Sequence, residues 1–151
     1  MNDDRFAAYE AKWAAFRRLE EEVLPGNKQA IFDALVAAGI QLVTVDFDGY
    51  GDEGHLEEPV GFDAANKDMP LPSASISVQQ VEFESSTIVQ ASTTVSEFIK
   101  NLTSDLLQKT HGGWQNGEGA YGTFNFNLEE RTITLQYHER YVETEYHEHE
   151  F

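Results

Sequence analysis

Two runs of alternating apolar and polar residues in the last third of the chain constrain its fold most strongly. Residues 123–128 and 132–137 each place an apolar side chain at every second position, with Glu129-Glu130 as a turn between them. This period of two is typical of strands that bury one face and expose the other. It predicts an antiparallel hairpin, and we expect a third strand over residues 141–147 to complete a β-meander.

The first 38 residues carry helical periodicity instead. Aromatic and aliphatic side chains recur every three or four positions between Phe6 and Val23, which predicts an amphipathic helix. Pro25-Gly26 is expected to end it, and Asn27 to cap a second helix. The aromatic stripe fits packing on the domain's own sheet, and it also fits a homodimer or partner contact through residues 6–23.

Between these regions the sequence predicts strands and one more helix. Strands are expected over residues 40–47 and 75–83, with a short edge strand at residues 60–62. Thr94 and Glu97 form a capping box that opens a central helix. Because the elements do not alternate regularly between strand and helix, we expect an α+β fold with a mainly antiparallel sheet. Two N-terminal helices and one central helix would pack it.

The charge of the chain is divided unevenly along its length. We expect a single domain over residues 1–151, with a helical segment at 1–38 and an α+β body at 40–151. The whole chain has 27 acidic and 10 basic residues, a net charge of −17. Residues 1–43 hold seven acids and five bases, and residues 44–151 hold twenty acids and five bases. The body therefore carries −15 of the total.

This composition excludes several classes of protein. Direct nucleic-acid binding is not expected, because affinity for the phosphate backbone comes from Lys and Arg. With no cysteine, disulfides, thiolate metal sites and cysteine nucleophiles are excluded. No apolar run approaches the roughly 20 residues of a membrane span, and the N-terminus lacks the basic start of a signal peptide. We expect a cytoplasmic protein that does not enter a membrane.

One acidic, glycine-rich segment has the spacing of a calcium-binding loop. Four positions of the twelve-residue pattern match, namely Asp46, Asp48, Gly51 and Glu57. Position 5 does not, since Tyr50 occupies it, and the glycines equally fit an acidic turn after a strand. The candidate metal ligands are Asp46, Asp48, Asp52 and Glu57, and calcium is the candidate cofactor. No catalytic motif accompanies them, and as acid–base pairs we single out only Glu53 with Glu57 and Asp48 with His55.

A second glycine-rich segment, residues 111–122, contains five glycines. It follows a predicted helix and precedes a strand, which is the reverse of a dinucleotide-binding fingerprint. In one interpretation it is a surface loop that presents Trp114, Asn116 and Tyr121 to a ligand or partner. In the other, Trp114 is a core residue and Asn116-Gly117 a turn.

The C-terminal residues offer a weaker metal pattern. On a strand, His147 and His149 would share a face, and His138 on a neighbouring strand would supply a third ligand. An alternating His/Glu terminus is more typical of a solvated edge. We therefore expect no structural metal there.

Residues 40–151 resemble a family of small uncharacterised bacterial proteins. The resemblance rests on Asp48-Gly49-Tyr50-Gly51-Asp52-Glu53-Gly54, on His111-Gly112-Gly113-Trp114 with the Asn116-to-Phe124 stretch that follows, and on the Glu-His-Glu-Phe ending. The family is a domain of unknown function found largely on plasmids and other mobile elements. Tyr50 and Gln115 depart from its smaller or acidic residues. The resemblance implies no established activity, but it implies a role in defence, counter-defence or maintenance.

These features predict a non-catalytic, acidic protein-binding domain. Its carboxylates would dock on the basic nucleic-acid channel of another protein, as DNA-mimic inhibitors of restriction or CRISPR enzymes do. The candidate binding residues are Trp114, Asn116, Tyr121, Asp52, Glu53 and Glu57. Two alternatives remain: the acidity serves solubility alone, or the segment from Asp46 to Glu57 makes a calcium-binding module or a metal-dependent hydrolase.

Overall fold

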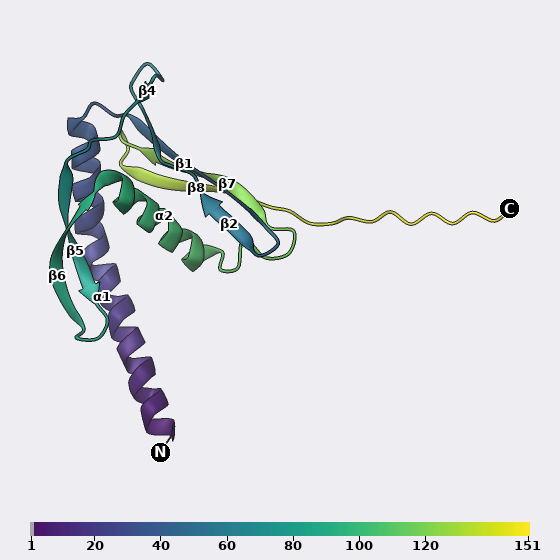
Figure 1. Ribbon diagram of the computed structural model, residues 1–151, viewed down its shortest axis with the longest axis horizontal. Helices are drawn as coiled ribbons and strands as arrows, with labels where there is room; N and C mark the ends of the chain where they lie inside the picture. The colour runs from purple at the N-terminus through teal and green to yellow at the C-terminus, as the bar shows by residue number, and fades with distance from the viewer. Residues whose placement is uncertain (1) are drawn as a thin grey trace.

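The computed structural model describes residues 2–151 and has an α+β fold with antiparallel sheets and two helices (Figure 1). The predicted fold class is confirmed, and the helix count is lower than expected. The elements follow one another as α1 (Asn2–Ala37), β1 (Leu42–Tyr50), β2 (Glu53–Leu56), β3 (Val60–Phe62), β4 (Asp68–Met69), β5 (Ser75–Glu82), β6 (Thr87–Thr94), α2 (Val95–Thr110), β7 (Ala120–Asn127) and β8 (Thr132–Glu139).

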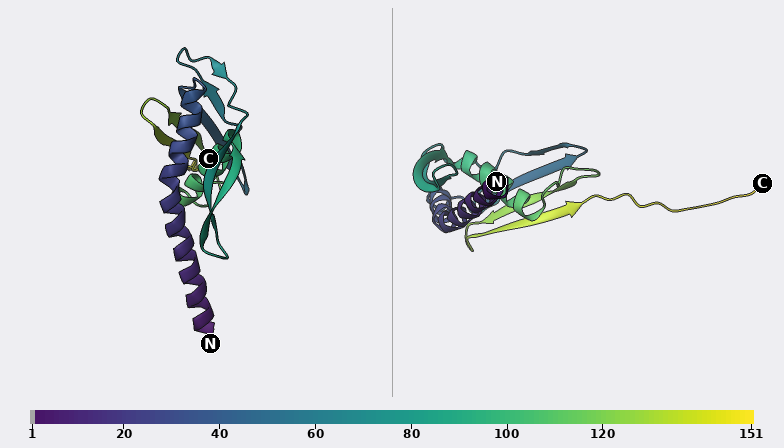
Figure 2. Two further views of the ribbon diagram at one scale, coloured as in Figure 1. Left: turned by 90° about the vertical axis from the view of Figure 1, so that its left-hand side faces the viewer. Right: turned by 90° about the horizontal axis from the view of Figure 1, so that it is seen from below.

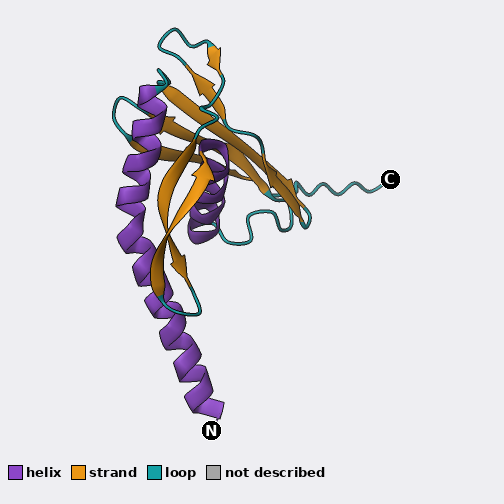
Figure 3. Cartoon of the chain, turned by 60° about the vertical axis from the view of Figure 1, so that its left-hand side comes forward, coloured by secondary structure: helices purple, strands orange, loops and turns teal. Residues whose placement is uncertain are grey.

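The main sheet has six strands, and β1 lies at its centre. Its order is β4-β3-β1-β7-β8, with β2 also paired to β1. β7 follows one edge of β1, while β2 and β3 share the other edge. β5 and β6 form a separate antiparallel hairpin that packs along α1 (Figure 3). The predicted hairpin near the C-terminus is β7–β8.

The core lies between the two helices and one face of the main sheet. Val43, Val45 and Phe47 of β1 are buried, while Asp46 and Asp48, on either side of Phe47, are exposed. The same alternation holds along β7. One face is thus apolar and covered by helices, and the other, which we call the open face, is polar. The helices contribute these buried residues to the core: Ile31, Phe32, Leu35, Val95, Ile99, Leu102 and Leu107.

α1 is one continuous helix, so the predicted break at Pro25-Gly26 is wrong. An interior proline removes a hydrogen bond and costs about 3 kcal/mol. Tertiary contacts on both sides of it hold the helix together, since Val23 is 6% exposed and Asn27 is 8% exposed. Asn27 is not a cap. Its Nδ2 donates to the Gln79 carbonyl of β5 and its Oδ1 accepts from the Gln79 amide, both at 2.8 Å.

Two strands also differ from expectation. Residues 87–94 form β6, which was not predicted, because Thr, Gln, Ala and Ser interrupt its apolar pattern. Conversely, residues 141–147 form no strand, so the predicted three-stranded meander is wrong. Beyond Arg140 the chain instead extends away from the body (Figure 1). We call residues 141–151 the tail.

The N-terminal half of α1 projects beyond the rest of the molecule (Figure 2). Its aromatic stripe packs on the tip of the β5–β6 hairpin, where Trp13 and Phe83 have ring centroids 4.6 Å apart. Phe6 and Tyr9 stay 66% and 54% exposed. Part of the stripe is therefore used within the chain, and dimerisation through residues 6–23 stays a prediction. Neither helix in the described part of the chain is long and apolar enough to cross a membrane.

The Thr94 half of the predicted capping box is present at the start of α2. The Thr94 hydroxyl oxygen accepts a hydrogen bond from the Glu97 amide at 3.2 Å. α2 places Val95 and Ile99 in the core, and it ends next to the second glycine-rich segment. The sequence was sufficient to predict the start of α2, because a helix cap depends only on residues that are close together in the chain.

The Asn27 contact gives a test of what holds α1 across Pro25. We expect Asn27→Ala to lower the free energy of unfolding by about 2 kcal/mol, because it leaves both backbone groups of Gln79 without their partner. Urea denaturation measures this loss. Gln29→Ala, at an exposed position of the same helix, is the control and should change stability little. Equal losses in the two variants would contradict the role of Asn27.

Candidate functional site

The two glycine-rich segments pack against each other around the indole of Trp114. Trp114 is 8% exposed and meets the Phe47 ring edge-on, with centroids 5.4 Å apart. Gly49 on β1 and Gly54 on β2 lie directly against it, because a Cβ at either position would come within 2.6 Å of the indole. Trp114 therefore takes its place as a core residue beneath the β1–β2 hairpin.

Backbone contacts connect the two segments as well. The Gly51 amide donates to the Gly117 carbonyl at 2.8 Å. Gly119 has a φ of +75°, and a Cβ there would overlap the Gly49 carbonyl oxygen. The glycines thus allow a close approach of two chain segments that are distant in sequence. As a result, the position of the acidic hairpin is fixed by the second segment.

The strand register of this hairpin brings several acidic residues to the open face. His55 lies opposite Asp48, and Glu53 lies opposite Tyr50. Glu57 continues the register, since its amide donates to the Asp46 carbonyl at 2.7 Å. Residues directly opposite each other in an antiparallel pair point to the same face. The acidic residues that share the open face are therefore Asp46, Asp48, Glu53 and Glu57, while Asp52 occupies the turn.

Arg140, just after β8, connects the end of that strand to β1. Its guanidinium donates to the Asp48 carboxylate at 2.9 Å and to the Gly49 carbonyl at 3.1 Å. It also lies over the Tyr121 ring, 4.6 Å from the centroid, and Tyr121 stacks on His138 with centroids 4.8 Å apart. One basic residue thus neutralises Asp48 and orders the aromatic side chains beside it.

A shallow depression of about 420 Å³ lies on the open face. Asp46 receives a hydrogen bond from the Thr123 hydroxyl at 2.7 Å, and His55 contacts Glu57 at 3.1 Å. The side chains that line this depression are those of Asp46, Asp48, Glu57, Tyr121, Thr123, Gln136 and His138. Within residues 2–151, Lys and Arg form ion pairs with Glu84, Glu58, Asp33 and Asp48. No Lys or Arg in that range pairs with Asp46, Asp52, Glu53 or Glu57.

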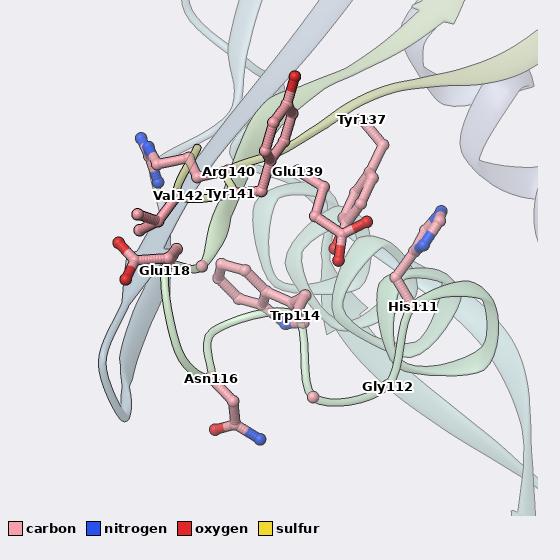
Figure 4. Close-up of a pocket in the computed structure, with 12 residues that line it drawn as sticks. His111, Gly112, Trp114, Asn116, Glu118, Tyr137, Glu139, Arg140, Tyr141 and Val142 are labelled. Carbon is pink, nitrogen blue, oxygen red and sulfur yellow. The ribbon is translucent and has the colours of Figure 1, made fainter. Parts of the chain in front are cut away.

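A second depression, of about 480 Å³, lies beside the second glycine-rich segment, where the chain leaves β8 (Figure 4). The His111 ring stacks on Tyr137 with centroids 3.6 Å apart. Burial raises the pKa of Tyr137, and the Glu139 carboxylate raises this pKa further. Trp114 and Asn116 line this depression, and the exposed Asn116 amide points away from the other labelled side chains. The depression therefore brings together only two of the predicted binding residues.

A third hollow, of about 510 Å³, runs between α1, α2 and the β5–β6 hairpin. Burial raises the pKa of both Glu20 and Asp105 there, while Lys109 lowers them. The sequence did not single out this groove, because its apolar residues carry the same periodicity as core residues.

The sequence patterns predicted only part of the open face. Glu53, Glu57 and Tyr121 lie on it as candidate binding residues, whereas Trp114 and Asn116 do not. The sequence did not single out Thr123, Gln136 or Arg140, and it singled out His138 only as a metal ligand beside His147 and His149. Their alternation identified the polar side of two strands. The acidic segment lies next to these polar residues because β1 pairs with β7. No local sequence pattern reveals that pairing.

The predicted metal ligands are only partly together. Asp46, Asp48 and Glu57 line the same depression, and Asp52 lies in the hairpin turn. Residues 47–56 pair as an antiparallel hairpin rather than wrapping around an ion. In the part of the chain that the structure describes, no group of three or more His, Asp or Glu side chains is placed to hold a metal. Calcium binding by this set stays a prediction.

The fold and the site define the class of protein as an α+β domain in which two interlocked glycine-rich segments support an open, acidic sheet face. A family of unknown function (DUF6878) matches residues 23–151, and the chain belongs to that family. The expected membership in a domain family of unknown function is thereby confirmed. No curated protein and no solved structure matches the chain. The family match begins within α1, so the helical residues before Val23 lie outside it.

The interlocked glycines make a matched pair of variants. Gly117 has a φ of +62° with open space around it, whereas Gly119 has a φ of +75° and faces backbone. We expect Gly117→Ala to cost about 1 kcal/mol from backbone strain alone. Gly119→Ala should cost about 3 kcal/mol or more, because the segments must also separate. Urea denaturation compares them, and equal losses would contradict the close packing.

The calcium-loop hypothesis makes its own prediction. A cation that binds only the folded state raises the melting temperature, so millimolar Ca²⁺ should do so if the site exists. A thermal-shift scan with Ca²⁺, Mg²⁺, Mn²⁺ and Zn²⁺ measures the effect. It should be lost in Asp46→Asn/Glu57→Gln. The hypothesis is contradicted if none of the four cations raises the melting temperature of the unaltered chain.

Proposed function

We propose that this protein is a non-catalytic protein-binding domain whose open acidic face docks on a basic surface of another protein. The surface comprises Asp46, Glu53 and Glu57 on the open face and Asp52 in the adjoining hairpin turn, with Tyr121 beside them. A basic channel that ordinarily binds nucleic acid is the kind of partner that such a surface fits, because complementary potentials steer encounter and fix the docked orientation.

The observation that carries the proposal is the pairing of Asp46 with Glu57 across neighbouring strands. Like charges directly opposite each other in a sheet are destabilising. Within residues 2–151, the ion pairs to Lys or Arg leave both carboxylates out. An opposite charge at one of these positions would stabilise the sheet instead. A positively charged partner would relieve this repulsion on binding.

The rigidity of the hairpin supports the same function. Its two strands are held by Trp114 beneath them and by the Gly51–Gly117 hydrogen bond at the tip. Carboxylates on a rigid support lose little conformational entropy when they bind. Solubility alone requires acidic residues, but it does not require them to be held in position.

The family resemblance suggests which partners to test first. A chain from a plasmid or other mobile element meets restriction and CRISPR nucleases, which hold DNA or RNA in basic channels. An acidic protein that occupies such a channel would act as a DNA-mimic inhibitor. The metal-dependent module remains the alternative, and the cation scan above tests it separately.

A nuclease panel tests the proposal. The unaltered chain is added to restriction endonucleases and CRISPR effector nucleases, and cleavage of plasmid DNA and direct binding are measured. We expect binding to at least one nuclease and weaker binding at higher salt. Asp52→Asn/Glu53→Gln/Glu57→Gln should weaken that binding by about tenfold or more, because it removes three of the docking charges.

The control removes the same amount of charge at another place. Glu10→Gln/Glu21→Gln/Glu22→Gln alters three exposed positions of α1, and it should bind as the unaltered chain does. If both triple variants bind equally weakly, total charge and not the open face determines binding. Inhibition that does not respond to salt, or no binding to any nuclease of the panel, would contradict the proposal.

A further inference from the structure

The two edges of the main sheet are protected very differently. β4, at one edge, has two residues and lies between Lys67 and Pro70. Short strands, lysine and proline are the usual means by which proteins prevent edge-to-edge pairing. β8, at the other edge, has eight residues and contains neither Lys nor Pro. This edge is therefore open to a further strand.

The backbone groups that β8 offers can be assigned from its pairing with β7. The Arg140 amide donates to the Gly119 carbonyl at 3.0 Å, toward β7. Because successive residues of a strand direct their amide and carbonyl to opposite edges, the outward groups belong to Ile133, Leu135, Tyr137 and Glu139. These four residues provide the hydrogen-bonding pattern that an added antiparallel strand needs.

The tail continues directly from this edge strand and leaves the body in an extended form (Figures 1 and 2). Tyr141, Val142, Tyr146 and Phe151 are 77%, 67%, 82% and 113% exposed. Beyond Arg140, the polar side-chain contacts in the described chain are within the tail itself, from Tyr146 to Glu148 and from His147 to Glu145. Aromatic and β-branched residues favour strands, so the tail is strand-like in sequence but has no strand beside it.

The tail of one chain can pair either with the tail of a second chain or with β8 of that chain, and charge favours the second arrangement. The tail carries Glu143, Glu145, Glu148 and Glu150, so two tails side by side would repel each other. β8 has only one carboxylate, Glu139. An acidic tail therefore fits beside β8 better than beside another tail.

We propose that two copies of this chain form a dimer in which the tail of each pairs antiparallel with β8 of the other. β8 has eight residues, and the first eight residues of the tail match its length, so a reciprocal exchange about a two-fold axis near Arg140 covers both edges. The dimer joins the two main sheets into one. It uses a surface separate from the acidic open face and does not depend on the proposed function.

Molar mass in solution tests the proposal on the full chain. Light scattering during size-exclusion chromatography, at about 0.1 mM protein, should give twice the chain mass of 17.0 kDa. Amide hydrogen exchange supplies a residue-level readout. The outward amides of Ile133, Leu135, Tyr137 and Glu139 should exchange more slowly as concentration rises. A mass of one chain at this concentration overturns the proposal.

Proline substitutions in the tail identify the interface without disturbing the fold. Thr144→Pro/His147→Pro places proline at one even and one odd position, so one of them removes a partner-facing amide whichever register is formed. This variant should be a monomer, whereas Thr144→Ala/His147→Ala should remain a dimer. A proline variant that dimerises as strongly as the unaltered chain overturns the proposal.

A second control separates this interface from the aromatic helix. Phe6→Ser/Tyr9→Ser changes the exposed aromatic residues at the start of α1, and it should leave the dimer intact. If this variant is a monomer and the proline variant a dimer, the interface lies on α1 and the tail exchange is wrong.

Discussion

The contact between Trp114 and two glycine-bearing strands determines the rest of the candidate site. An aromatic side chain of this size buries roughly 150–250 Å², which at about 25 cal/mol per Å² corresponds to about 4–6 kcal/mol. That burial is available only because Gly49 and Gly54 leave room for the indole. The two glycine-rich segments, which look in sequence like separate loops, are the two halves of one packed unit.

The acidic face follows from that unit. Gly119 and Gly51 bring the backbones together at the hairpin tip, and the hairpin register then points alternate carboxylates away from the core. Arg140 neutralises one of them, Asp48, by a contact across β7. The remaining carboxylates lie on a hairpin that Trp114 and the Gly51–Gly117 hydrogen bond hold in place. Acidic side chains held in position in this way support the proposed docking function, because binding then costs little conformational entropy.

Sequence patterns predicted the features that depend on near neighbours. The alternation in β7 and β8 and the Thr94–Glu97 cap were predicted and are present. The break at Pro25 was predicted and is absent, because Asn27 binds the backbone of β5, which is 52 residues distant. The open face was found only in part for the same reason, since it requires β1 to pair with β7. A strand at residues 141–147 was predicted from composition, yet one chain supplies no neighbour for it.

The symmetry of the proposed tail exchange determines how the two acidic open faces lie relative to each other. Two sheets that join edge to edge with antiparallel strands are related by a two-fold axis perpendicular to the sheet. Such an axis reverses strand direction and keeps each face on its own side. The open faces of both copies would therefore lie on the same side of one continuous sheet, with their helices together on the other. Two weak docking surfaces held in this way act on a partner with a raised effective concentration. In the proposed dimer a second chain provides the strand that pairs with the tail. The same chain also brings its own open face to the same side of the sheet, which doubles the acidic surface.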